Sequence, residues 1–440
     1  MRPIRVHTRR ALLGVLVVIA LVGLAATPAR SQLPVTRELA ERAALAAGPR
    51  VALARADSAE ARAALITAHA RPNPSLVASY TADKPTKHLS LDIPFDAPWT
   101  RRPRGSAAQA AERAAFLRLL SERVAAQLEV DTTYTMALAA QARFRLTHQT
   151  ARDADSLRSM AVARMKAGDA SDLDVQLATV LAGQQANAAS TDSLGYMHLL
   201  LAVQMLMGIP ADSVAIVLAD SLDFPRGIPA DGTTVAITPA AAARADSTAL
   251  ALGLSRLTGA ALDATPFVAA AFASVEAAEL SVAHERRMIW GVPSLQVGVD
   301  WGDPANDPPN KLLPLIGVSI PLPLLDRNRG PIAQAEAQRD RARAELQIAR
   351  LEVHQRLVEG ARERETLVRQ VARDRDLVVR ADRVSAMSLQ AYREGAMALP
   401  AVLEARRTAR EVLTQYIDDL ASLLTVEAEL RALTRTTPSP

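Results

Sequence analysis

Carboxylates cluster just after two glycines that lie far apart in the sequence. They are Asp169, Asp172 and Asp174, which follow Gly168, and Glu404, which follows Gly395. Short acidic side chains after a chain break can cap the start of a helix, where the helix dipole favours them, and this interpretation suits Asp169 and Asp172 best. A ring of carboxylates in a narrow passage has a different use, because it concentrates cations and repels anions. Both interpretations place these residues at the start of a helix.

Basic residues stand beside the same two glycines. Arg164 and Lys166 precede Gly168, and Arg393 precedes Gly395. Each glycine suits the C-terminal cap of a helix, where the chain needs a left-handed residue. The basic side chains could also pair with a partner protein, although an exposed ion pair is worth only about 0–1 kcal/mol.

The remaining reactive residue types form no catalytic or ligand-binding pattern. The chain has no cysteine, which excludes disulfides, thiolate metal sites, a cysteine nucleophile and a lipid-modified N-terminal cysteine. Its seven histidines form no close pair with carboxylates at metal-ligand spacing. The sequence contains no G-x-S-x-G, Walker loop or G-x-G-x-x-G motif. We therefore expect no enzymatic activity, no cofactor, no metal site and no nucleotide binding.

The first residues resemble an export signal. Four arginines precede an apolar run from Ala11 to Ala26, and small residues follow in "TPARSQ". A spanning helix needs about 20 apolar residues, so this run is short for an anchor and predicts a signal peptide, residues 1–29, cleaved after Ala29 or Ser31. Removing the four arginines cancels the formal charge of +4, so the mature chain is near neutral and we expect no nucleic-acid partner.

The mature chain repeats one plan twice. Each half contains a helical stretch, two short strands, a very long helix, a glycine and a shorter helix. Ile93 and Ile320, each followed by proline, are 227 residues apart, and Gly168 and Gly395 have the same offset. We place the first repeat at 32–208, a crossover with local structure at 209–239, the second repeat at 240–435 and a disordered tail at 436–440.

Four short segments alternate between apolar and small or polar residues, the period of a β-strand. They lie at Leu76–Thr81, His88–Ile93, Leu295–Trp301 and Ile316–Ile320. They could be ordinary surface hairpins packed on a soluble core. Alternatively, one face meets lipid and the other water, as in an outer-membrane barrel. Four strands cannot close a barrel, so the second interpretation requires three chains that together supply twelve strands.

The helical segments are unusually long. Gly105–Gly168 and Gly330–Gly395 would each span roughly 95 Å at 1.5 Å per residue. No compact core covers a stripe of that length, so we expect them to pack along other helices as coiled coils. Shorter helices are expected at Val35–Ala70, Asp172–Met207, Pro266–Ile289 and Leu399–Leu433. Two of these placed end to end match one long helix.

Proline and arginine mark the change from strand to long helix. Pro321 and Pro323 in "SIPLPLLDRNRG" end strand pairing, because proline has no backbone donor. Arginines follow in both repeats and would lie at a membrane rim near headgroup phosphates. They are Arg101 and Arg102 in the first repeat and Arg327 and Arg329 in the second.

The duplicated plan, with "RPNPSL", "IPLPLLDRNRG", "AGDASDLDV" and "YREG", resembles the TolC-like outer-membrane efflux proteins. The stretch "SIPLPLLDRNRG" looks most like the CzcC-type branch, which serves metal-cation efflux. The resemblance implies a mainly α fold with a small β part. Three copies would form a 12-stranded barrel in the outer membrane, continuous with an α-helical tunnel in the periplasm. The residues around Gly168 and Gly395 would face a periplasmic adaptor and an inner-membrane pump of the resistance–nodulation–division kind.

The resemblance also implies roles for the acidic residues. In this family, acidic residues just past each glycine line the closed end of the tunnel, and Asp174 and Glu404 stand at matching positions. Ala401 departs from the acidic pattern, and Asp169 and Asp172 could compensate. The expected function is a passive export duct, with heavy-metal cations as one candidate cargo. A periplasmic coiled-coil adaptor or scaffold without a pore is the alternative, although it would typically have one helical hairpin flanked by β-rich segments.

Overall fold

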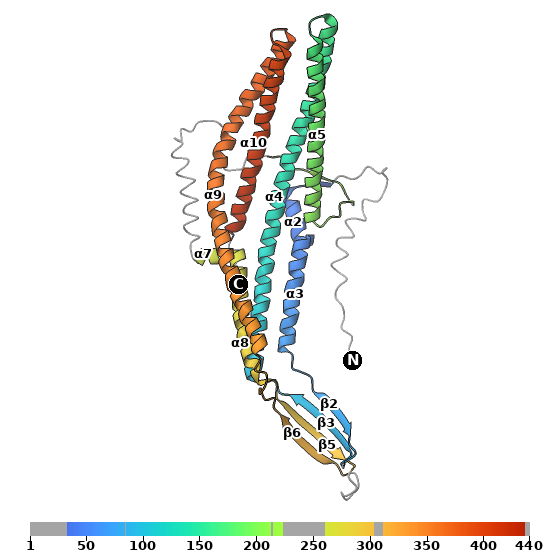
Figure 1. Cartoon of the computed structure of the whole chain (residues 1–440), viewed down its shortest axis with the longest axis vertical. Coiled ribbons are helices and arrows are strands. Elements are labelled where there is room, and N and C mark those ends of the chain that lie inside the picture. Colours follow the sequence, from blue (N-terminus) through green and yellow to red (C-terminus); the bar gives the residue numbers. More distant parts are fainter. Residues whose placement is uncertain (1–32, 84, 213, 223–259, 303–310, 436–440) are drawn as a thin grey trace.

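A computed structural model describes residues 33–83, 85–212, 214–222, 260–302 and 311–435. The predicted signal peptide, the tail at 436–440 and the part of the crossover after residue 222 lie outside the described residues. Within them the molecule is long and narrow, with a small sheet at one end and the turns of two helical hairpins at the other (Figure 1). The mainly helical fold class with a small β part is confirmed.

The first repeat runs from a short strand to the first hairpin. Its elements are β1 (Leu33–Val35), α2 (Arg37–Ala47), α3 (Pro49–His69), β2 (Ser75–Tyr80), β3 (Lys87–Pro94), α4 (Pro98–Ala167) and α5 (Asp172–Leu206). The short strand β4 (Ile216–Leu218) follows in the crossover. Helix α4 has 70 residues, so it extends along nearly the whole helical body (Figure 1).

The second repeat has the same order. Its elements are α7 (Ala260–Asp263), α8 (Pro266–Arg287), a 3₁₀ turn (Met288–Trp290), β5 (Ser294–Trp301), β6 (Leu313–Ser319), α9 (Arg329–Arg393) and α10 (Leu399–Leu433). Helix α9 has 65 residues and pairs with α10, as α4 pairs with α5. In the first repeat the expected end-to-end stacking of short helices is present, because the backbone of Gly48, just before α3, lies against the Leu206 carbonyl at the end of α5.

Two boundaries differ from the expectation. The predicted single helix Val35–Ala70 is wrong: Val35 belongs to β1, and Gly48 divides the rest into α2 and α3. Pro49 is the first residue of α3, where its missing N–H costs no helical hydrogen bond. The long helix of the first repeat begins at Pro98 instead of Gly105, with Pro103 inside its first two turns.

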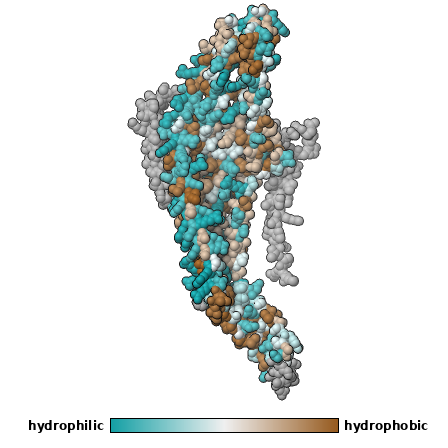
Figure 2. Space-filling model, in the orientation of Figure 1, coloured by the Kyte–Doolittle hydropathy of each residue, from teal (hydrophilic) through white to brown (hydrophobic). Residues whose placement is uncertain are grey.

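The four predicted strands form one antiparallel sheet in the order β2-β3-β5-β6. Strands β3 and β5 join the two repeats, with Leu91 opposite Val297. The register sets Leu76, Leu91, Val297 and Ile316 in one row on the mainly apolar face, whereas Val77 and Leu315 lie on the other face. Within the described residues, β2 and β6 are each paired on one side only. The predicted alternation is therefore confirmed. Figure 2 shows further hydrophobic residues gathered where the sheet meets the helices.

Several separate hydrophobic cores lie one after another along the helical body. One lies between α8, α9 and α10, with Leu357, Leu423 and Val371 buried at its centre. A second joins β1, α2 and β4 to α4 and α5 around Tyr134, whose hydroxyl donates to the Val35 carbonyl at 2.8 Å. The parallel pair β1–β4 thus adds the local structure expected of the crossover at mid-body.

Ion pairs between helices use many of the charged positions. Arg143 of α4 pairs with Asp418 of α10, and Arg364 of α9 pairs with Glu427 of α10 at 3.1 Å. Among the described helices, α8 alone is long and apolar enough to cross a membrane by length and composition. It lies against α4 and α9 within the helical body.

Candidate functional site

The two hairpin turns have the predicted glycine caps. Gly168 has φ 83° and Gly395 has φ 78°, the left-handed region that favours glycine. After Gly168, the Asp169 N–H donates to the Arg164 carbonyl at 2.9 Å. After Gly395, the Ala396 N–H donates to the Ala391 carbonyl at 2.8 Å. Both turns therefore close with the backbone pattern that ends a helix tightly.

Arg164 links the two hairpins at this end. Its Nη1 donates to the Tyr392 carbonyl at 2.9 Å, and its guanidinium lies 4.9 Å from the centre of the Tyr392 ring. Tyr392 is buried with Leu157, Ala161 and Leu399 in a core shared by both hairpins. Arg164 is thus already engaged within its own chain, whereas Lys166 and Arg393 are exposed.

The acidic residues divide into capping and exposed groups. Asp174 forms a capping box with Ser171: the Asp174 N–H donates to the Ser171 hydroxyl, and the Ser171 N–H donates to the Asp174 carboxylate, both at 3.2 Å. Asp172 lies exposed in the first turn of α5, and Asp169 is exposed in the loop before it. The capping role that the sequence suggested for Asp169 and Asp172 belongs mainly to Asp174.

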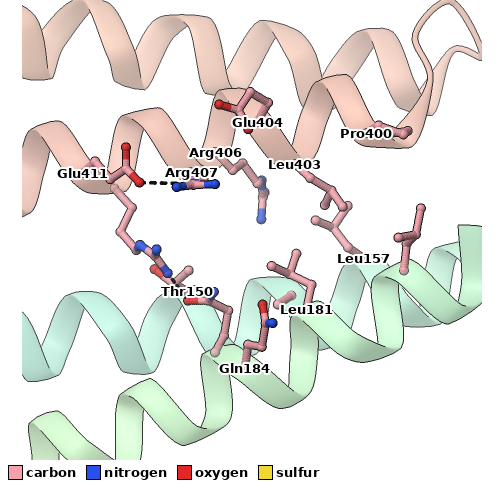
Figure 3. A pocket seen from close by; sticks show the side chains of 14 residues that line it. Thr150, Leu157, Leu181, Gln184, Pro400, Leu403, Glu404, Arg406, Arg407 and Glu411 are labelled. Atoms are coloured by element: carbon pink, nitrogen blue, oxygen red, sulfur yellow. Dashed lines mark hydrogen bonds and ion pairs between the residues drawn. The ribbon is translucent and has the colours of Figure 1, made fainter.

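A cavity of about 440 Å³ lies between α10 and the α4–α5 hairpin, close to these turns (Figure 3). Glu404 lines it, whereas Asp172 and Asp174 do not, so one copy does not bring the acidic candidates together. Arg406 extends from α10 into the space between the hairpins (Figure 3), 3.5 Å from the Asp153 carboxylate. Arg410 bonds to the buried Gln185 of α5.

The cavity wall carries mixed charge. Arg407 donates to the Glu411 carboxylate at 2.8 Å, and this hydrogen bond is the main reason why the pKa of Arg407 is raised. The negative charges of Glu411 and then Glu404 raise that pKa further. Glu404 therefore has a cation on the next turn of its own helix, which reduces the field that its carboxylate projects. Sequence reasoning did not single out Arg406, Arg407 or Arg410, although their spacing puts them along one helix.

The polar face of the sheet carries a hydroxyl, an imidazole and a carboxylate in a row. His88 Nδ1 lies 2.8 Å from Asp300, and its Nε2 lies 3.0 Å from the Thr81 hydroxyl. Thr81 also donates to the carbonyls of Asp83 and Pro85. Since these carbonyls accept the hydroxyl proton, Thr81 acts as a turn residue and no nucleophile is activated. Among the described residues no group of three His, Asp or Glu side chains is placed to hold a metal ion.

The rim arginines lie at the end of the sheet that joins the helices. Arg101 is 3.6 Å from Asp96, and the neighbouring Arg104 donates to the same carboxylate at 3.0 Å. Arg102, Arg327 and Arg329 are exposed and form no ion pair within the described part of the chain. Three of the four predicted rim residues thus have free guanidinium groups.

The sequence and fold were compared with known proteins. Residues 257–434 match the model of the family described as Outer membrane efflux protein. This match covers most of the second repeat, so that repeat carries the family's sequence pattern. No curated protein matches the chain.

Solved structures match almost the full length. The Campylobacter jejuni CmeC outer membrane channel has a TM-score of 0.70 at 14% identity, covering 90% of this chain and 85% of its own. The Vibrio cholerae outer membrane protein VceC has a TM-score of 0.67 at 15% identity, covering 90% and 96%. CusC, described as forming a transmembrane channel, has a TM-score of 0.66 at 15% identity, covering 94% and 96%. The chain therefore has the fold of outer-membrane channel proteins.

Proposed function

We propose that this protein is the outer-membrane duct of a tripartite efflux system and that three copies form it. The single observation that carries the proposal is the sheet. Its four strands share one mainly apolar face, and this face stays open within the described part of the chain: Ile316 is 76% exposed and Leu76 is 69% exposed. A soluble hairpin would pack this face on a core, so the geometry favours contact with lipid.

The edges of the sheet support assembly of several copies. In lipid an unpaired strand edge leaves backbone groups without hydrogen bonds, at a cost of several kcal/mol for each group. Strands β2 and β6 run in opposite directions, because three antiparallel pairings separate them. The β2 of a second copy can therefore continue the antiparallel order beside β6. Three copies give the twelve strands of the duct.

The helices provide matching surfaces. Apolar side chains remain exposed along α5, with Leu194, Met197 and Met205 each more than half exposed. Leu351, Val384 and Met387 are similarly exposed on α9. These helices belong to opposite sides of the molecule, as do the edge strands β2 and β6 (Figure 1). A heterologous contact between copies would cover both stripes and build a helical tunnel on the sheet.

The partners and cargo follow from the resemblance. Lys166 and Arg393 are free to meet a periplasmic adaptor, and a pump of the resistance–nodulation–division kind would supply the energy. The likeness of Ser319–Gly330 to the metal-cation branch supports heavy-metal cations as cargo. The competing proposal is a periplasmic scaffold without a pore. In that case the protein is surrounded by water, and another protein surface would have to cover the apolar face of the sheet.

Fractionation and conductance test the proposal. We expect the protein in the outer-membrane fraction as a detergent-requiring trimer that conducts ions in planar bilayers. A monomer released by osmotic shock would support the scaffold instead.

Cation selectivity tests the acidic residues at the tunnel end. Asp174→Asn combined with Glu404→Gln should shift the reversal potential in a salt gradient toward lower cation selectivity, because two carboxylates per copy are lost. Glu363→Gln, which removes an exposed carboxylate near the middle of α9, is the control. An unchanged reversal potential in the double variant would remove Asp174 and Glu404 from the selectivity filter.

A further inference from the structure

Exposed apolar residues form a belt where the sheet joins the helices, and the proposed function does not use it. We name it the junction belt; it consists of Phe95, Trp99, Val292, Ile320, Leu322, Leu324 and Leu325. Leu324 is 77% exposed, and Leu325 is as exposed as in an extended chain. Large apolar side chains seldom lie open to water in one contiguous group, so such a group indicates a partner surface.

Contacts hold the three connecting segments together. The Phe95 N–H after β3 donates to the Pro293 carbonyl before β5 at 2.7 Å. Pro321 after β6 lies so close to Gly291 that a Cβ there would meet its ring at 2.6 Å. Phe95 and Trp99 lie with ring centres 6.4 Å apart. The belt residues therefore belong to one junction, where Figure 2 shows hydrophobic residues gathered between the sheet and the helices.

The strands alone are too short for a membrane. Strands β2, β6, β3 and β5 contain 6, 7, 8 and 8 residues. At about 3.3 Å per residue and a tilt of about 40°, they span roughly 15–20 Å along the membrane normal, whereas the apolar band of an outer-membrane barrel is about 25 Å tall. The belt lies at the helical end of the strands (Figure 1), where its side chains can add apolar height.

Charge at the belt also fits a lipid surface. Arg327 and Arg329 follow Leu325 by two and four positions, after Asp326, and Arg102 lies one helical turn beyond Trp99; all three arginines are exposed. Leucines next to unpaired arginines match the boundary between acyl chains and phosphate headgroups. A second copy of this chain would instead need acidic groups opposite these arginines. The acidic residues in the same segments are engaged within the chain: Asp96 is bonded to Arg104, and Asp326 accepts from the Asn328 N–H at 2.9 Å.

We propose that the junction belt inserts into the phospholipid leaflet on the helical side of the membrane and completes the apolar height that the strands lack. The arginines Arg102, Arg327 and Arg329 then lie at the phosphate groups of that leaflet. This inference rests on the proposed function, because it assumes that the sheet itself spans the bilayer.

Tryptophan quenching tests the belt in the full-length protein. The chain has three tryptophans, so W290F/W301F leaves only Trp99 in the belt, and W99F/W290F leaves only Trp301 on the apolar face of the sheet. Both variants are reconstituted into phosphatidylcholine vesicles whose acyl chains are brominated. We expect both to lose emission relative to unbrominated vesicles. Quenching of Trp301 without quenching of Trp99 would overturn the belt, and quenching of neither would overturn the proposed function.

A labelled cysteine gives a second readout with all tryptophans intact. Because the chain has no cysteine, Leu325→Cys and Arg341→Cys each accept one environment-sensitive dye. Arg341 is the control, since its side chain is 80% exposed on α9. We expect blue-shifted emission, quenched by nitroxide-labelled lipid, at position 325 only. A blue shift without quenching would show that a second copy covers the belt. An unshifted emission would show that the belt is exposed to water. Either result overturns the proposal.

Discussion

At the scale of single residues, Arg164 has the most specific role in the hairpin turns. It combines a hydrogen bond to a backbone carbonyl with a stack on a buried ring, and its partner Tyr392 is 228 positions away. No sequence pattern could predict this contact, because it depends on how the two hairpins lie together. The Asp174 capping box, in contrast, was visible as Ser171 followed three positions later by an acid.

Replacing Arg164 by alanine should loosen the end of the second hairpin. The lost hydrogen bond and cation–π contact are together worth about 1–2 kcal/mol, which corresponds to roughly 5- to 30-fold faster amide exchange. Hydrogen exchange measured by mass spectrometry on peptides covering 389–397 checks this. Lys166→Ala, which removes an exposed cation from the same helix end, should leave those peptides unchanged. Equal exchange rates in the two variants would mean that Arg164 does not stabilise residues 389–397.

The carboxyl group of Asp374 on α9 should make the stability of the folded protein depend on pH in an unusual direction. Burial, then a hydrogen bond and the charge of Asp419 on α10, raise the pKa of Asp374, so folding favours its protonated form. Its stabilising contribution is therefore complete below the unfolded pKa near 4 and is lost as pH rises through the higher folded pKa. Asp374→Asn should raise the Tm at neutral pH, and the gain should vanish near pH 4 and below. Asp376→Asn, at an exposed position of α9, should show no such trend; a gain that persists in acid would contradict the assignment.

At the scale of elements, the sequence predicted types and periods better than boundaries and pairings. Alternation in "SLQVGVDW" identified β5 and its apolar face, because a strand has a fixed period of two. The expected helix Val35–Ala70 ran across the break at Gly48–Pro49, although Pro49 suits the first position of a helix, where α3 begins. The pairs β1–β4 and β3–β5 join segments about 180 and 200 positions apart, and local pattern carries no information about such partners.

The packing of α9 on α8 and α10 gives a prediction about elements. Leu357 is 2% exposed in their shared core, so Leu357→Ala should lower the free energy of unfolding by about 2–5 kcal/mol. Leu351, on the same helix, is 69% exposed, and Leu351→Ala is the matched control. Urea denaturation in detergent, followed by the helical circular dichroism signal, measures both. Equal effects would show that assembly covers Leu351 as fully as folding covers Leu357.

At the scale of the whole molecule, the described part of one chain leaves its sheet open on one face and at both edges. This sheet lies at the end of a helical body whose own cores are buried among α4, α5, α8, α9 and α10. Duplication accounts for this, because the sheet forms where one hairpin of each repeat meets the other. The sequence indicated the need for further copies from the strand number alone, and closure by three copies stays a prediction.

A charge placed on each face of the sheet tests this arrangement directly. Ile316 lies in the middle of β6 on the apolar face, opposite Val297, whereas Gln296 is the third residue of β5 and lies on the polar face, opposite Asp92. If the apolar face meets lipid, Ile316→Arg should cost about 2–4 kcal/mol per copy and sharply lower the fraction of protein that enters vesicles, while Gln296→Arg should insert normally. Flotation of refolded protein with vesicles in a density gradient measures that fraction. In a soluble protein the outcome differs, because Ile316 is exposed and an arginine there would leave folding unchanged and improve solubility. Normal flotation of Ile316→Arg would therefore contradict the membrane-spanning role of the sheet.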